Sequence, residues 1–216
     1  MKTDLTKMFH GESESSFSLK LKVAREAAYL LYRGVEKEYK QAKLRAAQTL
    51  GTSSLPSNRQ VALQLDKIAE ETEGDARRKR LIQMRQQAYE LMRILKDYPP
   101  VLVGSVWRGT IHHNSDIDLV VYSRDPQDVL KKIKQNNLKI LGTECVTVTQ
   151  RDLKKEYFHI YLELSNNQEG EVIVRSPDEM GQIRICEIFG DRISGLNLGE
   201  LKKLLEEDPT KRFVPI

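Results

Sequence analysis

The chain has 216 residues and a formal net charge of +4, which allows one well-packed domain or one domain with an appendage. Its two cysteines, Cys145 and Cys186, are far apart in the sequence, so a disulfide framework is not expected and both thiols are predicted to be reduced. No apolar run is long enough to cross a bilayer, and residues 1–18 have no apolar segment of the signal-peptide type. We therefore expect a soluble, cytoplasmic protein that does not contact membranes.

Positive charge is concentrated in the first half of the chain. Residues 1–98 contain 19 Lys and Arg against 13 Asp and Glu, whereas residues 99–216 contain 16 against 18. Such an asymmetry can mark a part that faces nucleic acid, although the solvated surfaces of ordinary helices have a similar composition.

Residues 1–98 are expected to be helical. Apolar residues recur at spacings of three and four from residue 18 to residue 50, which predicts one long amphipathic helix that can bend at Gly34. The turn-forming stretch "GTSSLPSN" separates it from a second helix, and Gly74 separates the second from a third. The third helix ends before Pro99 and Pro100, because proline cannot continue a helix. The segment is therefore predicted to be an all-α N-terminal extension of about three helices.

Residues 99–216 have a strand-like periodicity with interspersed helices. Strands are expected at residues 101–105, 116–122, 145–149, 157–164 and 170–175, and helices at 125–137 and 196–208. This order of elements predicts an α/β (α+β) fold, in which a mixed sheet carries helices on one face.

Two short motifs lie in the first two of these strands. Gly104 and Ser105 end a strand, where a glycine lets backbone N–H groups approach a phosphate and the serine hydroxyl adds a donor. Asp116 and Asp118 are one residue apart on the next strand, so their carboxylates point from the same face. Neighbouring carboxylates repel one another unless a cation lies between them, and Mg²⁺ prefers carboxylate and phosphate oxygens. The two motifs predict a site for a metal-bound nucleoside triphosphate.

The stretch "GSVWRGTIHHNSDIDL" resembles the signature of the polymerase β-like nucleotidyltransferase superfamily, and in particular its minimal nucleotidyltransferase branch. The residues that carry the resemblance are Gly104, Ser105, Arg108, Gly109, Thr110, Ser115, Asp116 and Asp118. The resemblance covers roughly residues 99–175 and implies a nucleotidyltransferase sheet, with residues 99–216 as the catalytic domain.

The resemblance also implies roles for these residues. Gly104 and Ser105 would hold the β- and γ-phosphates of ATP or another nucleoside triphosphate, while Asp116 and Asp118 would bind two divalent ions, Mg²⁺ or Mn²⁺. The remaining expected nucleotide-binding residues are Arg108, Gly109, Thr110 and Ser115.

Members of the superfamily use a third carboxylate on a later strand to activate the acceptor hydroxyl and to bind metal. Glu163 and Glu171 compete for this role, because both lie on the polar faces of their strands. If the hairpin turned symmetrically about Asn167, the two would be cross-strand neighbours. We predict Glu171, because the third carboxylate of the family usually opens the last strand of such a pair, although aspartate is commoner there.

The activity implied by the resemblance is transfer of a nucleoside monophosphate, AMP from ATP, to a hydroxyl group with release of pyrophosphate. The sequence leaves the acceptor open: an RNA bound by the basic N-terminal helices, a tyrosine or serine of a partner protein, or a small molecule. The alternative is a non-catalytic nucleotide-binding or RNA-binding regulatory protein with the same fold.

Three further features allow two interpretations each. His112 and His113 fit an exposed turn, but could also touch a metal or a phosphate. Trp107 could stack on a base or pack under the loop. The run "DARRKRLIQMR" at residues 75–85 could bind RNA phosphates or form a solvated helix surface.

Overall fold

The structure of the protein, a computed structural model, describes the backbone of residues 6–150 and 153–215, and side chains within residues 18–148 and 154–215. The chain divides into two compact units. Unit 1 comprises the chain up to Gly74 together with residues 112–114 and 186–190, and unit 2 comprises residues 75–111, 115–185 and 191–216.

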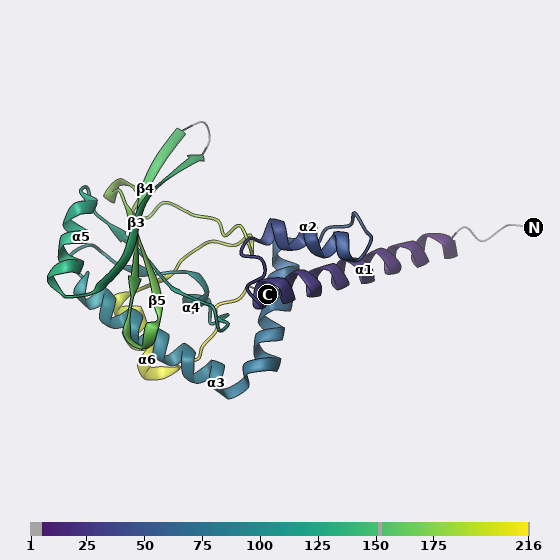
Figure 1. Cartoon of the computed structure of the whole chain (residues 1–216), viewed down its shortest axis with the longest axis horizontal. Coiled ribbons are helices and arrows are strands. Elements are labelled where there is room, and N and C mark those ends of the chain that lie inside the picture. Colours follow the sequence, from purple (N-terminus) through teal and green to yellow (C-terminus); the bar gives the residue numbers. More distant parts are fainter. Residues whose placement is uncertain (1–5, 151–152, 216) are drawn as a thin grey trace, which may run out of the picture. The chain divides into compact units, whose positions relative to one another are not determined.

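Unit 1 is built from helices whose contacting faces are rich in alanine. Its elements are α1 (Thr6–Tyr32), α2 (Tyr39–Thr49) and the first half of α3 (Asn58–Ile94). Figure 1 shows α1 and α2 side by side, and Ala24, Ala28 and Ala46 are among the fully buried residues that they share. Small side chains let the helix backbones approach closely, so this core needs few large residues.

The prediction of one helix over residues 18–50 is wrong. The helix ends at Tyr32, and Gly34 has a φ of 67°, a left-handed conformation that glycine adopts without strain. The amide of Gly34 donates to the carbonyl of Leu31 at 3.0 Å, which closes the last turn before α2 begins.

Gly74 interrupts α3. Its backbone angles, φ 49° and ψ −127°, are not helical, so the break that the sequence indicates at this glycine is present. The residues after Gly74 bury their apolar stripe in the core of unit 2, including Leu81, Met84 and Leu91. They therefore belong with the sheet in the structure, whereas the sequence placed the boundary between the helical region and the sheet domain at residues 98 and 99.

The sheet of unit 2 has six strands in the order β3-β4-β5-β2-β1-β6. Their bounds are β1 Val101–Leu102, β2 Ile117–Tyr122, β3 Lys139–Gln150, β4 Leu153–Glu163, β5 Glu169–Arg175 and β6 Leu196–Asn197. Strands β2 and β5 are parallel and the other neighbours are antiparallel, so the sheet is mixed. The strand expected at 101–105 is shortened because a helix begins at Gly104, while β3 and β4 form a longer hairpin than expected (Figure 1).

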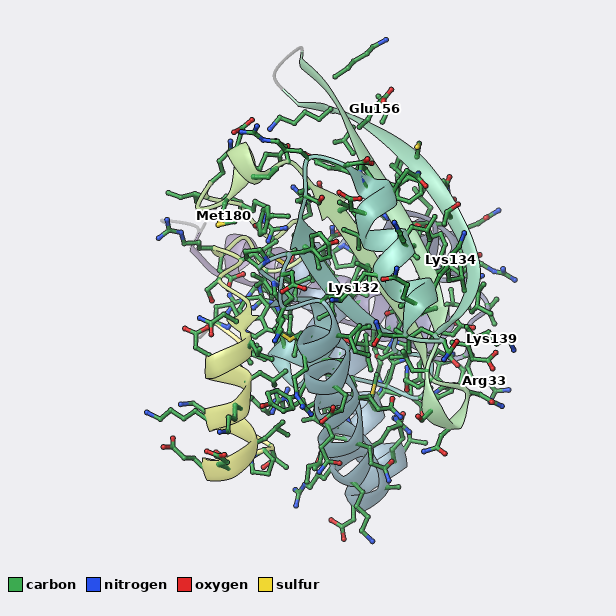
Figure 2. The ribbon with its side chains drawn as sticks, turned by 90° about the vertical axis from the view of Figure 1, so that its left-hand side faces the viewer. Arg33, Lys132, Lys134, Lys139, Glu156 and Met180 are labelled. Atoms are coloured by element: carbon green, nitrogen blue, oxygen red, sulfur yellow. The ribbon has the colours of Figure 1, made fainter. Side chains whose placement is uncertain are left out.

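Helices cover one face of this sheet. They are the second half of α3, α4 (Gly104–Arg108), α5 (Pro126–Gln135) and α6 (Leu198–Glu207). Their apolar residues join Leu119, Ile160 and Val172 of the strands in one core. The outer side of α5 carries Lys132 and Lys134 (Figure 2). The expected fold, a mixed sheet with helices on one face preceded by helices, is confirmed.

The register of the β4–β5 hairpin differs from the prediction. Glu163 pairs with Glu169 and Tyr161 pairs with Glu171, so Glu163 and Glu171 are not directly opposite each other. The turn contains Asn166 and Asn167 with φ of 61° and 56°, and it centres the hairpin on Asn166. Asparagine tolerates this left-handed conformation better than most residues, which explains the shift.

No helix within the described residues is long and apolar enough to cross a membrane.

Candidate active site

The turn between β1 and α4 brings the backbone against an acidic side chain. Gly104, the first residue of α4, has a φ of 70°, and a Cβ atom at this position would overlap the carboxylate of Asp118. Glycine is therefore required both for the backbone conformation and for the close approach. Ser105 follows it, and the carbonyl of Ser105 accepts a hydrogen bond of 3.0 Å from the amide of Thr110. Gly104 and Ser105 thus begin a tight turn beside Asp118.

Arg85 supports this turn from inside unit 2. Its guanidinium is fully buried and donates to the carbonyls of Val106 and Trp107 in α4, at 3.1 and 2.9 Å. It also donates to the carbonyls of Pro209 and Lys211, at 2.8 and 2.9 Å. Burial lowers the pKa of Arg85 to about 10, and the nearby Asp208 opposes that shift. A cation at the carbonyl end of a short helix satisfies groups that would otherwise lack partners.

Arg108 is held by partners within unit 2. Its guanidinium is almost fully buried, bonds both carboxylate oxygens of Asp191 at 2.6 and 3.1 Å, and donates to the carbonyl of Phe213 at 3.0 Å. A buried arginine held by a bidentate carboxylate fixes the C-terminal end of α4. In the structure Arg108 therefore supports the turn, and its role in nucleotide binding stays a prediction.

The other motif residues lie around the same turn. Gly109 ends α4 with a φ of 73°, and a Cβ there would press against Lys211 and Arg212. Thr110 is half-buried. The side-chain amide of Gln168 donates a hydrogen bond of 3.0 Å to the carbonyl of Ser115, which helps to shape the segment between the two motifs.

Three carboxylates gather at one end of β2 and β5. Asp116 directly precedes β2, Asp118 lies within it, and Glu171 of β5 is the register partner of Asp118 across the parallel pair. Ile117 and Leu119 are fully buried on the helix-covered face, so Asp118 points from the opposite face. The two predicted aspartates and the favoured glutamate therefore lie together.

The acidic groups repel each other. Burial raises the pKa of Asp118 well above its usual range, and Asp116 and Glu171 raise it further. Burial also raises the pKa of Asp116, with additional contributions from Glu171 and Glu169. Carboxyl groups with raised pKa values in a shared site indicate negative charge that the protein itself does not balance.

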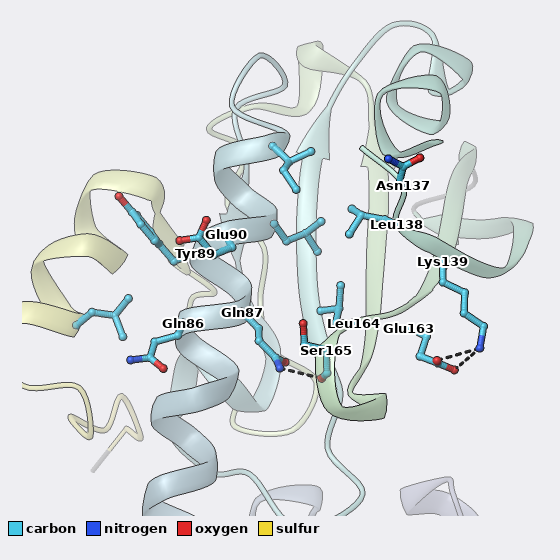
Figure 3. A pocket seen from close by; sticks show the side chains of 13 residues that line it. Gln86, Gln87, Tyr89, Glu90, Asn137, Leu138, Lys139, Glu163, Leu164 and Ser165 are labelled. Carbon is cyan, nitrogen blue, oxygen red and sulfur yellow. Dashed lines mark hydrogen bonds and ion pairs between the residues drawn. The ribbon is translucent and has the colours of Figure 1, made fainter. Parts of the chain in front are cut away.

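The two candidate third carboxylates have different partners. Glu171 lies 2.6 Å from Nδ1 of His159, with both side chains mostly buried. Glu163 is held by the ammonium of Lys139, which donates to both of its oxygens at 2.9 Å, and Figure 3 shows this pair at the edge of a cavity of about 630 Å³. The geometry therefore supports Glu171 as the partner of the aspartates.

These residues fit a divalent cation in their chemistry. Hard cations such as Mg²⁺ and Mn²⁺ take carboxylate oxygens, and a cation between Asp116 and Asp118 would relieve the repulsion that raises their pKa values. Within the part of the chain that the structure describes, no three His, Cys, Asp or Glu side chains already form a ligand set. A bound triphosphate would supply the remaining oxygens, as Mg²⁺ sites commonly require.

Trp107 and His113, for which the sequence left two interpretations open, both have partners within the protein. Trp107 is buried, and its ring stacks on Phe213 with centroids 6.4 Å apart, so it packs within unit 2. In unit 1, the ring of His113 contacts Tyr32 edge-on at 4.5 Å, and the amide of His113 donates to Glu73 at 3.0 Å. These contacts account for Trp107 and His113 without a ligand.

Sequence reasoning missed the buried arginines. Arg77 and Arg85 belong to the basic run at residues 75–85, yet both are buried, and Arg77 donates to the carbonyl of Ile111 at 2.7 Å. Their spacing of eight residues places both on one side of α3, in line with the buried Leu81 and Met84. That periodicity is the signal that could have separated them from the exposed Arg78 and Lys79.

The site thus combines a glycine turn at the end of a strand, two aspartates at the next strand and a glutamate beside them. Residues 84–171 match the family model of the nucleotidyltransferase domain, and this match confirms the resemblance to the superfamily. The matched segment contains the turn, both aspartates and Glu171. A search of curated proteins finds no match.

Solved structures with similarity to the chain include a cytoplasmic RNA terminal U-transferase, at 18% identity and a TM-score of 0.29 over 55% of this chain and 34% of that one. The Cid1 poly(U) polymerase matches at 21% identity and a TM-score of 0.29, over 51% of this chain and 35% of that one. The chain thus spans about a third of the length of these enzymes.

Proposed function

We propose that the protein is a metal-dependent nucleotidyltransferase that moves a nucleoside monophosphate, AMP from ATP, to a hydroxyl group and releases pyrophosphate. The observation that carries the proposal is the placement of Asp116, Asp118 and Glu171 at one end of β2 and β5, with Gly104 against Asp118. The raised pKa values of both aspartates support it, because they indicate a site that favours a bound cation.

The divalent ions would be held by Asp116, Asp118 and Glu171, and when bound they neutralise charge on the triphosphate and align it with the acceptor. The backbone at Gly104, which lies against Asp118, and the hydroxyl of the adjacent Ser105 would receive the β- and γ-phosphates. The acceptor oxygen attacks the α-phosphorus while the bond from that phosphorus to the oxygen that bridges to the β-phosphate breaks, so pyrophosphate leaves.

Glu171 would take the proton of the acceptor hydroxyl. Its contact of 2.6 Å with His159 orients the carboxylate, and the neighbouring Tyr161 is its register partner on β4. Burial raises the pKa of Tyr161, and Glu171 and Glu144 raise it further; the phenol donates to Glu144 at 3.3 Å.

The direct test uses full-length protein with each of the four nucleoside triphosphates labelled at the α-phosphate, Mg²⁺ and cell extract. We expect covalent transfer of label to one class of acceptor, with ATP as the best donor. The D118N variant should transfer none, and E163Q, which changes a carboxylate outside the cluster, should transfer normally. Binding of triphosphate without transfer to any fraction would instead support the non-catalytic regulatory protein.

A further inference from the structure

A second cavity of about 630 Å³ lies within unit 2 at the far end of β2 from the aspartates. Tyr122, the last residue of β2, and Val101 of β1 contribute to its wall. Other lining residues come from the segment between β5 and β6, where Met180 is labelled in Figure 2, and from the start of α6. Its size is within the range of cavities that hold small ligands.

All the charged residues that line the cavity are positive. Lys96, Arg184 and Arg192 line it, and its lining includes no aspartate or glutamate. Among the described residues none of these three cations is within ion-pair distance of a carboxylate, whereas nearby Arg175 and Lys155 are both paired with Glu179. Burial lowers the pKa of the Arg184 guanidinium and the neighbouring Arg175 lowers it further, whereas Tyr122, Glu179 and Tyr157 oppose that shift. The cavity therefore attracts an anion.

The rest of the wall suits an organic anion. Leu198 and Gly199, the first residues of α6, line the cavity, and the N–H groups in the first turn of a helix carry partial positive charge. Apolar contacts come from Pro99, Met180 and Ile193, and the ring of Tyr122 provides an aromatic wall. A ligand with both a phosphate and a flat, largely apolar base would match this combination.

The cavity is also within reach of the carboxylates. Tyr122 lies four positions after Asp118 on β2, which corresponds to about 13 Å along a strand. Tyr122 belongs to the small apolar cluster with Val103 and Val120, on the sheet face opposite the helix-covered core. Asp118 points from that same face, so the carboxylates and the cavity lie on one side of the sheet.

We propose that this cavity binds a phosphorylated nucleotide of a single-stranded nucleic-acid acceptor, upstream of the hydroxyl that receives the new nucleotide. Lys96, Arg184 and Arg192 bind the phosphate, and Tyr122 and Met180 contact the base. The inference rests on the proposed function for the identity of the reacting end, but the binding itself needs neither metal nor triphosphate.

The test measures binding of a short fluorescent oligoadenylate RNA by anisotropy, without Mg²⁺ and without triphosphate, over a series of salt concentrations. We expect the R184Q/R192Q variant to bind at least about tenfold more weakly, with the slope of log affinity against log salt reduced by about 0.7 for each lost phosphate contact. The R93Q/K131Q control removes the same charge from exposed positions outside the cavity and should bind as wild type. Equal losses in both variants would overturn the proposal, because they would reflect net charge.

The exposed Lys96 provides a second variant that does not disturb the interior. K96Q should weaken RNA binding about threefold to tenfold while the melting temperature stays that of wild type. If neither K96Q nor R184Q/R192Q weakened RNA binding while remaining folded, the assignment would be overturned. If wild type bound RNA as expected but transferred no nucleotide, only the proposed function would be overturned.

Competition separates an acceptor strand from a free nucleotide. AMP and inorganic phosphate should displace the labelled RNA only at concentrations far above the RNA dissociation constant, and unphosphorylated adenosine should not displace it. If AMP bound as tightly as the RNA and lost affinity in R184Q/R192Q, the cavity would be a free-nucleotide site and the acceptor proposal would fail.

Discussion

The two ends of β2 carry opposite, unbalanced charges on the same face of the sheet. At the beginning of the strand, Asp116 and Asp118 lie beside Glu171, and their pKa values are raised by burial and by one another. At its end, Tyr122 adjoins a cavity lined by Arg184 and other cations, with no acidic residue in the lining. Elsewhere on this face, Lys155 and Arg175 are neutralised by a shared glutamate.

This difference shows where like charges are held together in the fold. Paired charges such as those around Glu179 satisfy each other, whereas like charges held together lower stability unless an external partner joins them. The acidic end needs a cation and the basic end needs an anion. The proposed substrate complex of metal, triphosphate and nucleic acid would supply both.

The largest expected effect comes from removing charge at the acidic end. D118N should reduce nucleotide transfer by at least about a thousandfold, because Asp118, the proposed metal ligand that lies against Gly104, loses its charge. Initial rates with α-labelled triphosphate and Mg²⁺ measure this loss. Full activity in D118N would contradict the metal assignment.

The same variant should change how stability depends on pH. A carboxyl whose pKa is raised by folding stabilises the protein below its unfolded pKa of about 4, and that contribution is lost as pH rises through the raised value. Without divalent ions, wild type should therefore lose melting temperature relative to D118N as pH rises from about 4 toward neutrality. Mg²⁺ should narrow the gap, and an unchanged difference across this range would contradict the repulsion at Asp118.

A smaller loss is expected when the acidic cluster keeps both aspartates. E171Q should lower the transfer rate by about two to four orders of magnitude, the usual range for a lost general base, with triphosphate affinity little changed. E163Q is the matched control, because that carboxylate is bound to Lys139. Single-turnover rates and equilibrium binding separate the two effects, and reversed effects would assign the role to Glu163.

Disturbing the backbone at the acidic end should have a moderate effect. G104A adds a methyl group where the carboxylate of Asp118 lies and strains a backbone with a φ of 70°. We expect transfer to fall by about tenfold to a hundredfold and the free energy of unfolding to drop by about 1 to 2 kcal/mol. G51A is a control for backbone strain alone, because Gly51 also has positive φ, has no atom within 4 Å of an added Cβ and lies outside the cavity.

The smallest effect is expected at the exposed basic residues of α3. R78Q/K79Q should change RNA affinity by less than about twofold, because these side chains are solvated and lie outside the cavity. Measured beside R184Q/R192Q in the same salt series, this variant tests whether the basic end of β2 or the basic run of α3 binds the acceptor. A larger loss in R78Q/K79Q would favour the N-terminal helices, as the charge distribution of the sequence first suggested.

Sequence alone predicted the parts of the site that depend on neighbours in the chain. The glycine turn and the two aspartates lie within one short segment, and alternation along β2 was enough to place Asp118 away from the core. The hairpin register was missed because it depends on left-handed conformations at Asn166 and Asn167, which the residue types permit but do not require.

The parts that sequence could not predict depend on contacts between distant segments. In the sequence, Arg85 cannot be distinguished from the other basic residues of a charged run. Its burial is favourable because distant carbonyls, including those of Pro209 and Lys211, accept its hydrogen bonds. Arg108 likewise stands at a motif position, but its carboxylate partner is Asp191, far along the chain. No local pattern connects these residues, so their roles emerge only from the fold.

The hydrogen bonds of Arg85 have a consequence for the order in which the protein is made. The turn at Gly104 is translated well before Pro209 and Lys211, whose carbonyls share the buried guanidinium with α4. Contacts that close such long loops form late in folding, since loop-closure entropy must be overcome first. A ribosome-bound chain that has not yet exposed residues 209–211 would therefore have Asp116 and Asp118 but no rigid turn beside them, and the site would mature only after residues 209–211 have left the ribosome.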